Sequence, residues 1–147
     1  MKFKITLKID RKYGDLLPFN YQYEQSAVIY RILAQADTQY SSWLHENGYL
    51  LHERKRFKLF CYSPFIFEKV KPLPEAGSLN IIGEKAVWYI SFIPEKSTLE
   101  FIQGIFAHQS FSIGNKKYQV AFDVVGVEAI PMPQLSEEMT FVALSPI

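Results

Sequence analysis

The chain has 147 residues, 48% of them hydrophobic and 16% aromatic, which is enough apolar material for one folded domain and excludes a disordered chain. No apolar run reaches the roughly 18 residues of a membrane helix, and Met1–Asp10 alternates lysine with apolar residues instead of forming a signal peptide. The single cysteine, Cys61, excludes an internal disulfide, so we expect a cytoplasmic protein.

The net charge of +1 hides an asymmetry between the two halves of the chain. Residues 1–74 carry 12 Lys and Arg against 7 Asp and Glu, a net +5, whereas residues 75–147 carry 4 against 8, a net −4. A basic half favours a polyanionic partner, although an ordinary solvated surface can have the same composition.

The first quarter of the chain predicts a strand and then a helix. Lys2–Ile9 alternates strictly between polar and apolar residues, as a half-buried strand does, and Arg11–Asn20 is predicted to be a loop. Over Tyr21–Ala36, apolar residues recur at helical spacing and form one stripe centred near Ile32. Tyr30 lies off that stripe, where its ring can pack at the core boundary or its hydroxyl can act on a ligand.

A second, short helix is predicted from Asp37 to Asn47, and it carries a candidate acid–base residue. His45 is near the C-terminal end of this helix, where the helix dipole favours the charged imidazolium. A plain surface histidine fits this position equally well. His52 is a weaker candidate in the following loop, and His108 is expected to be structural.

A run of cations follows the short helix. The segment from residue 52 to residue 58 is predicted to be a loop with one acid and four cations, which are Arg54, Lys55, Arg56 and Lys58. Arginine offers bidentate donors and lysine a point charge, so the loop suits phosphate contacts, although a solvated loop has the same composition. Phe57–Phe67 then predicts a long strand or a pair of strands that includes Cys61.

The second half of the chain predicts the remaining elements. In chain order these are a loop over Lys69–Ser78, a hairpin over Ser78–Ile93, a helix from Pro94 with a buried stripe of Leu99, Ile102, Ile105 and Phe106, strands over Ser110–Ile113 and Tyr118–Ile130, and a short strand over Thr140–Leu144. The order β, α, β, β, α, β predicts the ferredoxin-like α+β plan, an antiparallel sheet with two helices on one face. This plan serves enzymes, RNA-binding modules and metabolite sensors, so it does not decide function.

Several chemistries have no support in the sequence. It contains no glycine-rich phosphate loop of either common type, no Cys/His set with zinc spacing, and no carboxylate cluster suited to magnesium. The aromatic sheet motif of RNA-recognition domains is absent as well. Metal-free acid–base chemistry is what remains, or no catalysis at all.

Five segments, in order along nearly the whole chain, resemble the landmarks of one known family. They are Leu17–Tyr23, Ile29-Tyr30, Trp43–Glu46, Phe57–Pro64 and Phe141–Ile147. The chain is similar to the CRISPR repeat-processing endoribonucleases, the Cas six family of the RAMP superfamily, which have two ferredoxin-like domains in tandem. The resemblance implies that residues 1–133 form the first domain and that residues 134–147 lead, as a linker and first strand, toward a second domain that this chain lacks.

The resemblance also implies an activity and a site. The family cuts precursor CRISPR RNA within its repeats without metal or other cofactor: the 2′-hydroxyl attacks the adjacent phosphorus, the 5′-oxygen leaves, and a cyclic phosphate end results. By position, His45 corresponds to the catalytic histidine, Tyr30 to the active-site tyrosine, and Lys58 to the lysine, with Lys55 as an alternative. Histidine titrates near neutral pH, lysine can hold a developing anion, and tyrosine can orient the 2′-hydroxyl, so the residue types fit these roles.

The implied partner is CRISPR repeat RNA, contacted by Arg54, Lys55, Arg56 and Lys58. Two rival hypotheses stay open: a noncatalytic RNA-binding or scaffold module with an idle His45, and a small-molecule sensor that dimerises through its sheet. Association with other CRISPR effector proteins, a homodimer, the repeat sequence that is recognised and the position of the cut are open as well.

Overall fold

The computed structural model describes residues 2–36, 49–51, 55–57, 60–92, 104, 106–131, 133–134, 136–140 and 142. For Ala36 and for the two short segments 49–51 and 55–57, it describes the backbone only.

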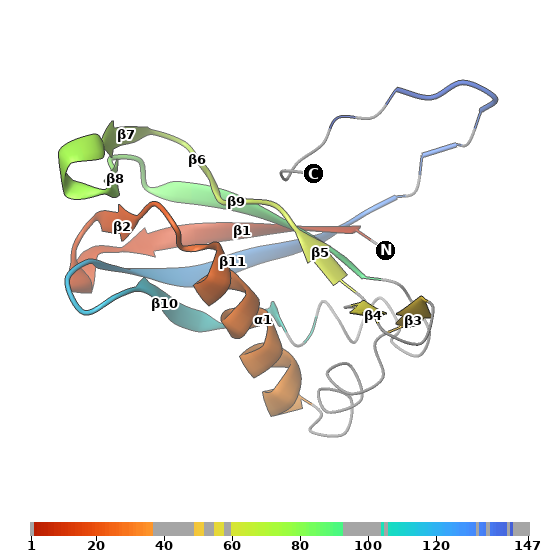
Figure 1. The fold of residues 1–147 in the computed structure, drawn as a ribbon, viewed down its shortest axis with the longest axis horizontal. Coiled ribbons are helices and arrows are strands. Elements are labelled where there is room, and N and C mark those ends of the chain that lie inside the picture. The colour runs from red at the N-terminus through yellow and green to blue at the C-terminus, as the bar shows by residue number, and fades with distance from the viewer. Residues whose placement is uncertain are drawn as a thin grey trace.

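An antiparallel sheet of six strands forms the centre of the fold (Figure 1). Its strands follow the order β10 (Ser110–Gly114), β11 (Gln119–Ile130), β1 (Lys2–Asp10), β9 (Lys85–Phe92) and β5 (Phe60–Tyr62), and β6 (Ile66–Phe67) also pairs with β9. Because β1 and β5 each run antiparallel to β9 between them, they are parallel to each other. Helix α1 (Gln22–Ala36) lies between them in the chain and, as Figure 1 shows, crosses one face of the sheet, which makes a split βαβ unit.

The regular patterns of the sequence produce the predicted core. On β1 the apolar residues Phe3, Ile5, Leu7 and Ile9 are all at most 3% exposed, while the lysines between them lie on the other face. The α1 stripe is buried against this apolar face through Val28, Ile29, Ile32 and Leu33. Fully buried Trp88 and Phe122, from the strands on either side of β1, complete the centre.

Three segments that the sequence predicts to be loops instead contribute strands to two smaller sheets. They consist of β2 (Leu16–Pro18), β8 (Ser78–Ile81) and β7 (Val70–Leu73) in one case, and of β3 (Tyr49–Leu51) and β4 (Lys55–Phe57) in the other. The 3-10 helices η1 (Arg11–Tyr13) and η2 (Pro74–Ala76) occupy further parts of the predicted loops. Strands of three or four residues are too short to show alternation, and Pro18 and Pro72 are tolerated because β2 and β7 are the edges of their sheet.

The predicted hairpin over Ser78–Ile93 is wrong, although both of its strands exist. β8 pairs with β2 and β7, whereas β9 pairs with β1, β5 and β6. The residues that connect β8 to β9 are bound to the segment before β7: the backbone N–H groups of Ile82 and Gly83 both donate to the Lys69 carbonyl at 2.9 Å.

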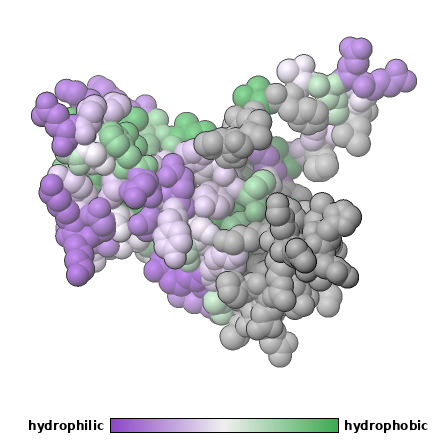
Figure 2. All heavy atoms as spheres, in the orientation of Figure 1, coloured by the Kyte–Doolittle hydropathy of each residue, from purple (hydrophilic) through white to green (hydrophobic). Residues whose placement is uncertain are grey.

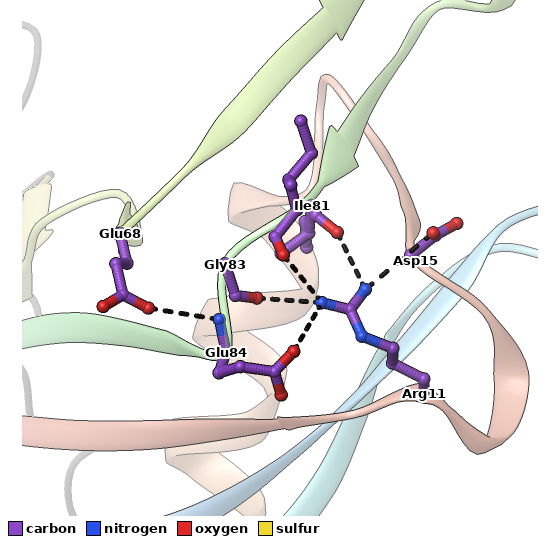
Figure 3. Close-up of polar contacts among 7 residues, drawn as sticks. Arg11, Asp15, Glu68, Ile81, Gly83 and Glu84 are labelled. Atoms are coloured by element: carbon purple, nitrogen blue, oxygen red, sulfur yellow. Dashed lines mark hydrogen bonds and ion pairs between the residues drawn. The ribbon is translucent and has the colours of Figure 1, made fainter.

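The Arg11 guanidinium holds the same connection from the other side (Figure 3). Its Nη1 donates to the Ile81 carbonyl at 2.9 Å, and its Nη2 donates to the Ile82 and Gly83 carbonyls at 3.0 Å and to Glu84 Oε1 at 3.2 Å. Asp15 Oδ2 lies 3.8 Å from Nη1. The chain therefore bends at Gly83 and Glu84 and passes from β8 to β9 without the two strands pairing.

Three further predictions have different outcomes. The short helix predicted over residues 37–47 lies outside the described residues. Of the helix predicted from Pro94, Gly104 and Phe106 are described and helical, and Phe106 is buried with its ring centroid 6.1 Å from that of Phe92. Thr140 and Val142, the two described residues of the last predicted strand, are not in a strand.

Candidate active site

Tyr30 is the predicted site residue whose side chain the structure describes. It lies on α1 next to fully buried Ile29, is half-buried, and packs against the core. Its ring meets Phe60, the first residue of β5, edge-on, with centroids 5.3 Å apart and planes at 71°. Phe60 in turn lies 5.9 Å from Phe92, centroid to centroid. The ring therefore holds Tyr30 at the core boundary, as its position off the apolar stripe predicts.

Three hydrogen bonds attach the start of α1, and Tyr21 just before it, to the last residue of β5 and the segment that follows it. The Tyr62 hydroxyl donates to the Gln22 carbonyl at 2.8 Å, and Gln25 Nε2 donates to the Ser63 carbonyl at 3.3 Å. The Tyr21 hydroxyl accepts from the backbone N–H of Phe65 at 3.1 Å. These bonds fix the position of the helix on the strand, and hence that of Tyr30 over Phe60.

The phenol of Tyr21 has a pKa that its surroundings displace. Burial raises the pKa of its phenol above the ordinary value of 10.0, and the hydrogen bond from Phe65 lowers it by less. The ring of Tyr21 also stacks on Phe65 with centroids 5.4 Å apart. Sequence reasoning missed this anchoring role, because Tyr21 precedes the helix and its partner Phe65 is 44 residues away.

The basic segment leads directly to the strand that carries Phe60. β4 ends at Phe57 and β5 begins at Phe60, so only two residues separate the pair β3–β4 from the strand beneath Tyr30. Figure 1 accordingly shows β3 and β4 close to the start of β5. Within the basic segment, Lys55 and Arg56 belong to β4 and are not in the predicted loop, because they pair with Leu51 and Leu50.

The remaining candidate residues lie in several parts of the chain. His45, Lys58 and Arg54 lie outside the described residues, as does His52, so their roles stay predictions. His108 is exposed and has a φ of 60° just after a helical segment, a position typical of a helix C-terminus, which agrees with a structural residue. Cys61 lies in β5 as predicted, with its side chain exposed.

The described part of the chain holds no group of three or more His, Cys, Asp or Glu side chains that could bind a metal ion. In the same residues, no helix is long and apolar enough to span a lipid bilayer.

The fold is shared with solved RAMP-type structures. One, titled "An RAMP protein binding different RNA substrates", has a TM-score of 0.66 and 24% sequence identity, and the match covers 93% of this chain and 51% of that one. Another, "Characterization of a Cas6-related gene from Pyrococcus furiosus", has a TM-score of 0.66 and 23% identity, covering 92% of this chain and 50% of that one. These likenesses define the class of fold, a mixed α/β protein with antiparallel sheets.

A family model places the chain within this class. The model described as CRISPR-associated protein Cas6, N-terminal, matches residues 16–122. The chain therefore belongs to the Cas6 family, and the resemblance seen in the five sequence segments is confirmed.

Curated relatives agree with the family. CRISPR-associated endoribonuclease Cas6 1 of Methanocaldococcus jannaschii is 24% identical over 89% of this chain and 46% of its own length. CRISPR-associated endoribonuclease Cas6 of Pyrococcus furiosus is 24% identical over 100% of this chain and 52% of its own length. The putative CRISPR-associated endoribonuclease-like protein Cas6nc of Pyrococcus horikoshii is 26% identical over 100% of this chain and 55% of its own length. The chain spans about half the length of these relatives.

Proposed function

We propose that this chain carries the catalytic residues of an endoribonuclease that cleaves precursor CRISPR RNA within its repeats. The observation that carries the proposal is the Cas6 family match over residues 16–122, which includes every candidate site residue from Tyr30 to Lys58. The relatives from M. jannaschii and P. furiosus, both named as CRISPR-associated endoribonucleases, support it.

The proposed reaction is a transesterification that needs no metal. The RNA 2′-hydroxyl gives up its proton and attacks the adjacent phosphorus, the bond to the 5′-oxygen breaks, and that oxygen takes up a proton, which leaves a 2′,3′-cyclic phosphate and a 5′-hydroxyl. His45 takes part in the proton transfer, Tyr30 orients the 2′-hydroxyl, and Lys58 stabilises the charged phosphorane. The cations Arg54, Lys55, Arg56 and Lys58 bind the flanking phosphates.

The packing of Tyr30 supports its part in this site. Its ring is anchored on Phe60, and Lys58 precedes Phe60 by only two residues in the sequence. A side chain anchored by ring contacts and by a hydrogen-bonded helix loses little conformational entropy when a substrate binds, which favours a positioning role.

The proposal extends to the architecture. The strand order β11, β1, β9 and β5, together with a buried Phe106 in a second helical segment, supports a ferredoxin-like βαββαβ domain over residues 1–133. We place residues 134–147 outside this domain, as a segment leading away from it. Removing residues 134–147 should then leave the thermal unfolding midpoint within a few degrees of its value for the whole chain.

The direct test is cleavage in the presence of EDTA. The 147-residue chain, and the longest polypeptide that contains it, are each incubated with a labelled CRISPR repeat RNA and excess EDTA. We expect one cut within the repeat, with a cyclic phosphate end identified by mass spectrometry. The same RNA with a single 2′-deoxy nucleotide at the cut should stay intact, because it lacks the nucleophile. Metal-dependent cutting, or cutting of the deoxy substrate, would contradict the mechanism.

A noncatalytic RNA-binding module is the second candidate. The relative from P. horikoshii is named endoribonuclease-like, and its 26% identity over the whole chain is close to that of the relatives named as endoribonucleases. Salt-sensitive binding of repeat RNA without any cleavage by the longest polypeptide would favour this candidate. Analytical ultracentrifugation of the same samples tests for a homodimer, and pull-down with other CRISPR effector proteins tests for a larger assembly.

A further inference from the structure

A polar hollow of about 380 Å³ lies between η1, α1 and β10, apart from the Tyr30–Phe60 pair. Lys12 and Tyr13 line it from η1, Arg31 and Gln35 from α1, and Ser110 and Ser112 from β10. None of the described residues that line it is acidic. Its size is within the range of small-ligand sites, and its chemistry suits an anion that accepts hydrogen bonds.

Two cations reach this hollow from separate elements. Arg31 is exposed and is in no ion pair within the described part of the chain. The Lys12 ammonium lies 3.4 Å from Asp10 Oδ2 and 5.3 Å from the centroid of the Tyr13 ring. Arg31 therefore offers its full planar set of donors to a ligand, while Asp10 competes for Lys12.

The strand side of the hollow adds neutral donors. The Ser112 hydroxyl accepts from Gln119 Nε2 at 3.1 Å, so its own proton remains for a ligand oxygen. Ser110, in contrast, already donates to Asp123 at 2.6 Å. β10 is also the outermost strand of the main sheet, so no described strand pairs with the backbone groups of its outer edge.

Tyr13 connects this hollow to a second one. It is 58% exposed and also lines an adjacent hollow of about 260 Å³, together with Lys117 and Tyr118. Asp15 lines this second hollow as well, and its Oδ2 lies 3.8 Å from Arg11 Nη1. The Lys117 ammonium lies 4.8 Å from the centroid of the Tyr118 ring. Each of the two hollows thus has a cation beside an aromatic ring. Figure 2 shows hydrophilic residues gathered over the end of the molecule where Figure 1 places the β10–β11 turn. Single-stranded nucleic acid fits such a surface, because cations bind its phosphates while rings stack on its bases.

We infer that these two hollows form one groove, lined by Arg31, Lys12, Tyr13, Tyr118 and Lys117, that binds a single-stranded segment of RNA. Arg31, Lys12 and Ser112 bind one phosphate, and Tyr13 offers its ring to a base. The inference rests on the proposed function for the identity of the RNA, and it adds a contact surface built from residues far apart in the sequence.

The test measures binding without cleavage. A short fluorescein-labelled oligouridylate with 2′-O-methyl groups, which cannot attack its own phosphates, is titrated with the 147-residue chain and followed by fluorescence anisotropy. Arg31→Ala and Lys12→Ala should each weaken binding about 5- to 10-fold and flatten the salt dependence by roughly 0.7 in log–log slope. Asp10→Asn should tighten binding, because it removes the competing charge and keeps an acceptor for the Lys12 backbone N–H.

Matched variants separate the groove from general charge effects. Lys71→Ala removes an equal charge from exposed β7, in a different sheet, and should change affinity less than about 2-fold. Tyr13→Phe should bind like the parent, and Tyr13→Ala should lose about 5-fold or more, because stacking needs the ring and not the hydroxyl. Far-UV circular dichroism confirms that each variant is folded.

Three outcomes would overturn the inference. One is an equal loss for Lys71→Ala and Arg31→Ala, and another is no loss in any groove variant. The third is binding of uridine monophosphate or inorganic phosphate as tight as that of the oligonucleotide, which would make the hollow a mononucleotide or phosphate site. The repeat-cleavage assay is independent of these binding measurements. If the RNA is not cleaved but its affinity depends on Arg31, the proposed activity alone is refuted. If the RNA is cleaved but the groove variants bind it as tightly as the parent, the groove alone is refuted.

Discussion

Arg11 is the residue that ties the end of β1 to the connection between β8 and β9. Its guanidinium donates to three successive backbone carbonyls and to one carboxylate, a set that only a planar fork of donors can satisfy (Figure 3). Since those carbonyls belong to a segment 70 residues later in the chain, this one side chain helps to hold the connection through which β8 and β9 enter different sheets.

Replacing Arg11 should therefore destabilise the fold. Arg11→Ala removes the donor to the part-buried Ile81 carbonyl and to the exposed Ile82 and Gly83 carbonyls, and it should lower the free energy of unfolding by about 2 kcal/mol, discounted for the exposure of the site. Arg11→Lys should recover only part of the loss. Urea denaturation measures the effect, and Arg31→Ala, also on the surface, is the matched control that should stay near the parent. Equal midpoints for Arg11→Ala and Arg31→Ala would contradict the role of Arg11.

Tyr21 predicts a pH dependence of stability. Burial raises the pKa of its phenol in the folded state, so the neutral form is favoured there. The contribution of Tyr21 to the free energy of unfolding is fully present below 10.0, the pKa of the phenol in the unfolded chain. This contribution is lost as the pH rises from that value toward the pKa in the folded state, because the unfolded chain then releases its proton first.

Two variants check this dependence. Tyr21→Phe should remove the part of the stability loss above pH 10 that Tyr21 causes. At neutral pH it should lower the free energy of unfolding by about 1–3 kcal/mol, because the Phe65 N–H loses its acceptor. Tyr23→Phe, at a position that is 81% exposed, should change neither quantity. Denaturation at a series of alkaline pH values provides both results, and a Tyr21→Phe profile that runs parallel to the parent would refute the assignment.

At the scale of elements, the β10–β11 turn depends on one glycine. Gly114 has a φ of +143°, and a Cβ there would lie 2.1 Å from the Tyr118 carbonyl oxygen. Gly114→Ala should therefore destabilise the protein by at least about 2 kcal/mol, since both the backbone conformation and the contact are strained. Gly104→Ala is the contrasting change: a Cβ meets nothing within 4 Å, and the residue is helical, so stability should rise or stay unchanged. The thermal unfolding midpoint should fall clearly in Gly114→Ala and should rise or stay unchanged in Gly104→Ala. An equal fall of the midpoint in both variants would argue against the strained turn.

Long, regular elements could be predicted from the sequence, and short ones could not. β1, α1 and the pair β10–β11 each carry several periods of alternation or helical spacing, and their boundaries were predicted within a few residues. β2 and β7, with three and four residues, carry less than two full periods and contain prolines. The pairing of β8 was predicted wrongly, because the residues that contact the end of this strand, such as Arg11 and Asp15, are distant in the sequence.

For the molecule as a whole, the site could be predicted only where the residue pattern is local. The boundary position of Tyr30 follows from the helical stripe, whereas its ring partner Phe60 is 30 residues away and belongs to another element. The anchors Tyr21 and Tyr62 were missed for the same reason, as was the groove, whose residues come from η1, α1 and the β10–β11 region. Tertiary contacts of this kind leave no periodicity in the sequence.

Single-turnover cleavage of a repeat RNA by the longest polypeptide tests whether the chain supplies the catalytic histidine of a CRISPR RNA endoribonuclease. His45→Ala should abolish cleavage and leave RNA binding within about 1 kcal/mol of the parent, because a group that transfers protons acts mainly in the transition state. His108→Asn is the matched control: it also removes an imidazole, at a position whose φ of 60° asparagine tolerates, and should cleave at the parental rate. Cleavage by His45→Ala at the parental rate would contradict a catalytic role for His45.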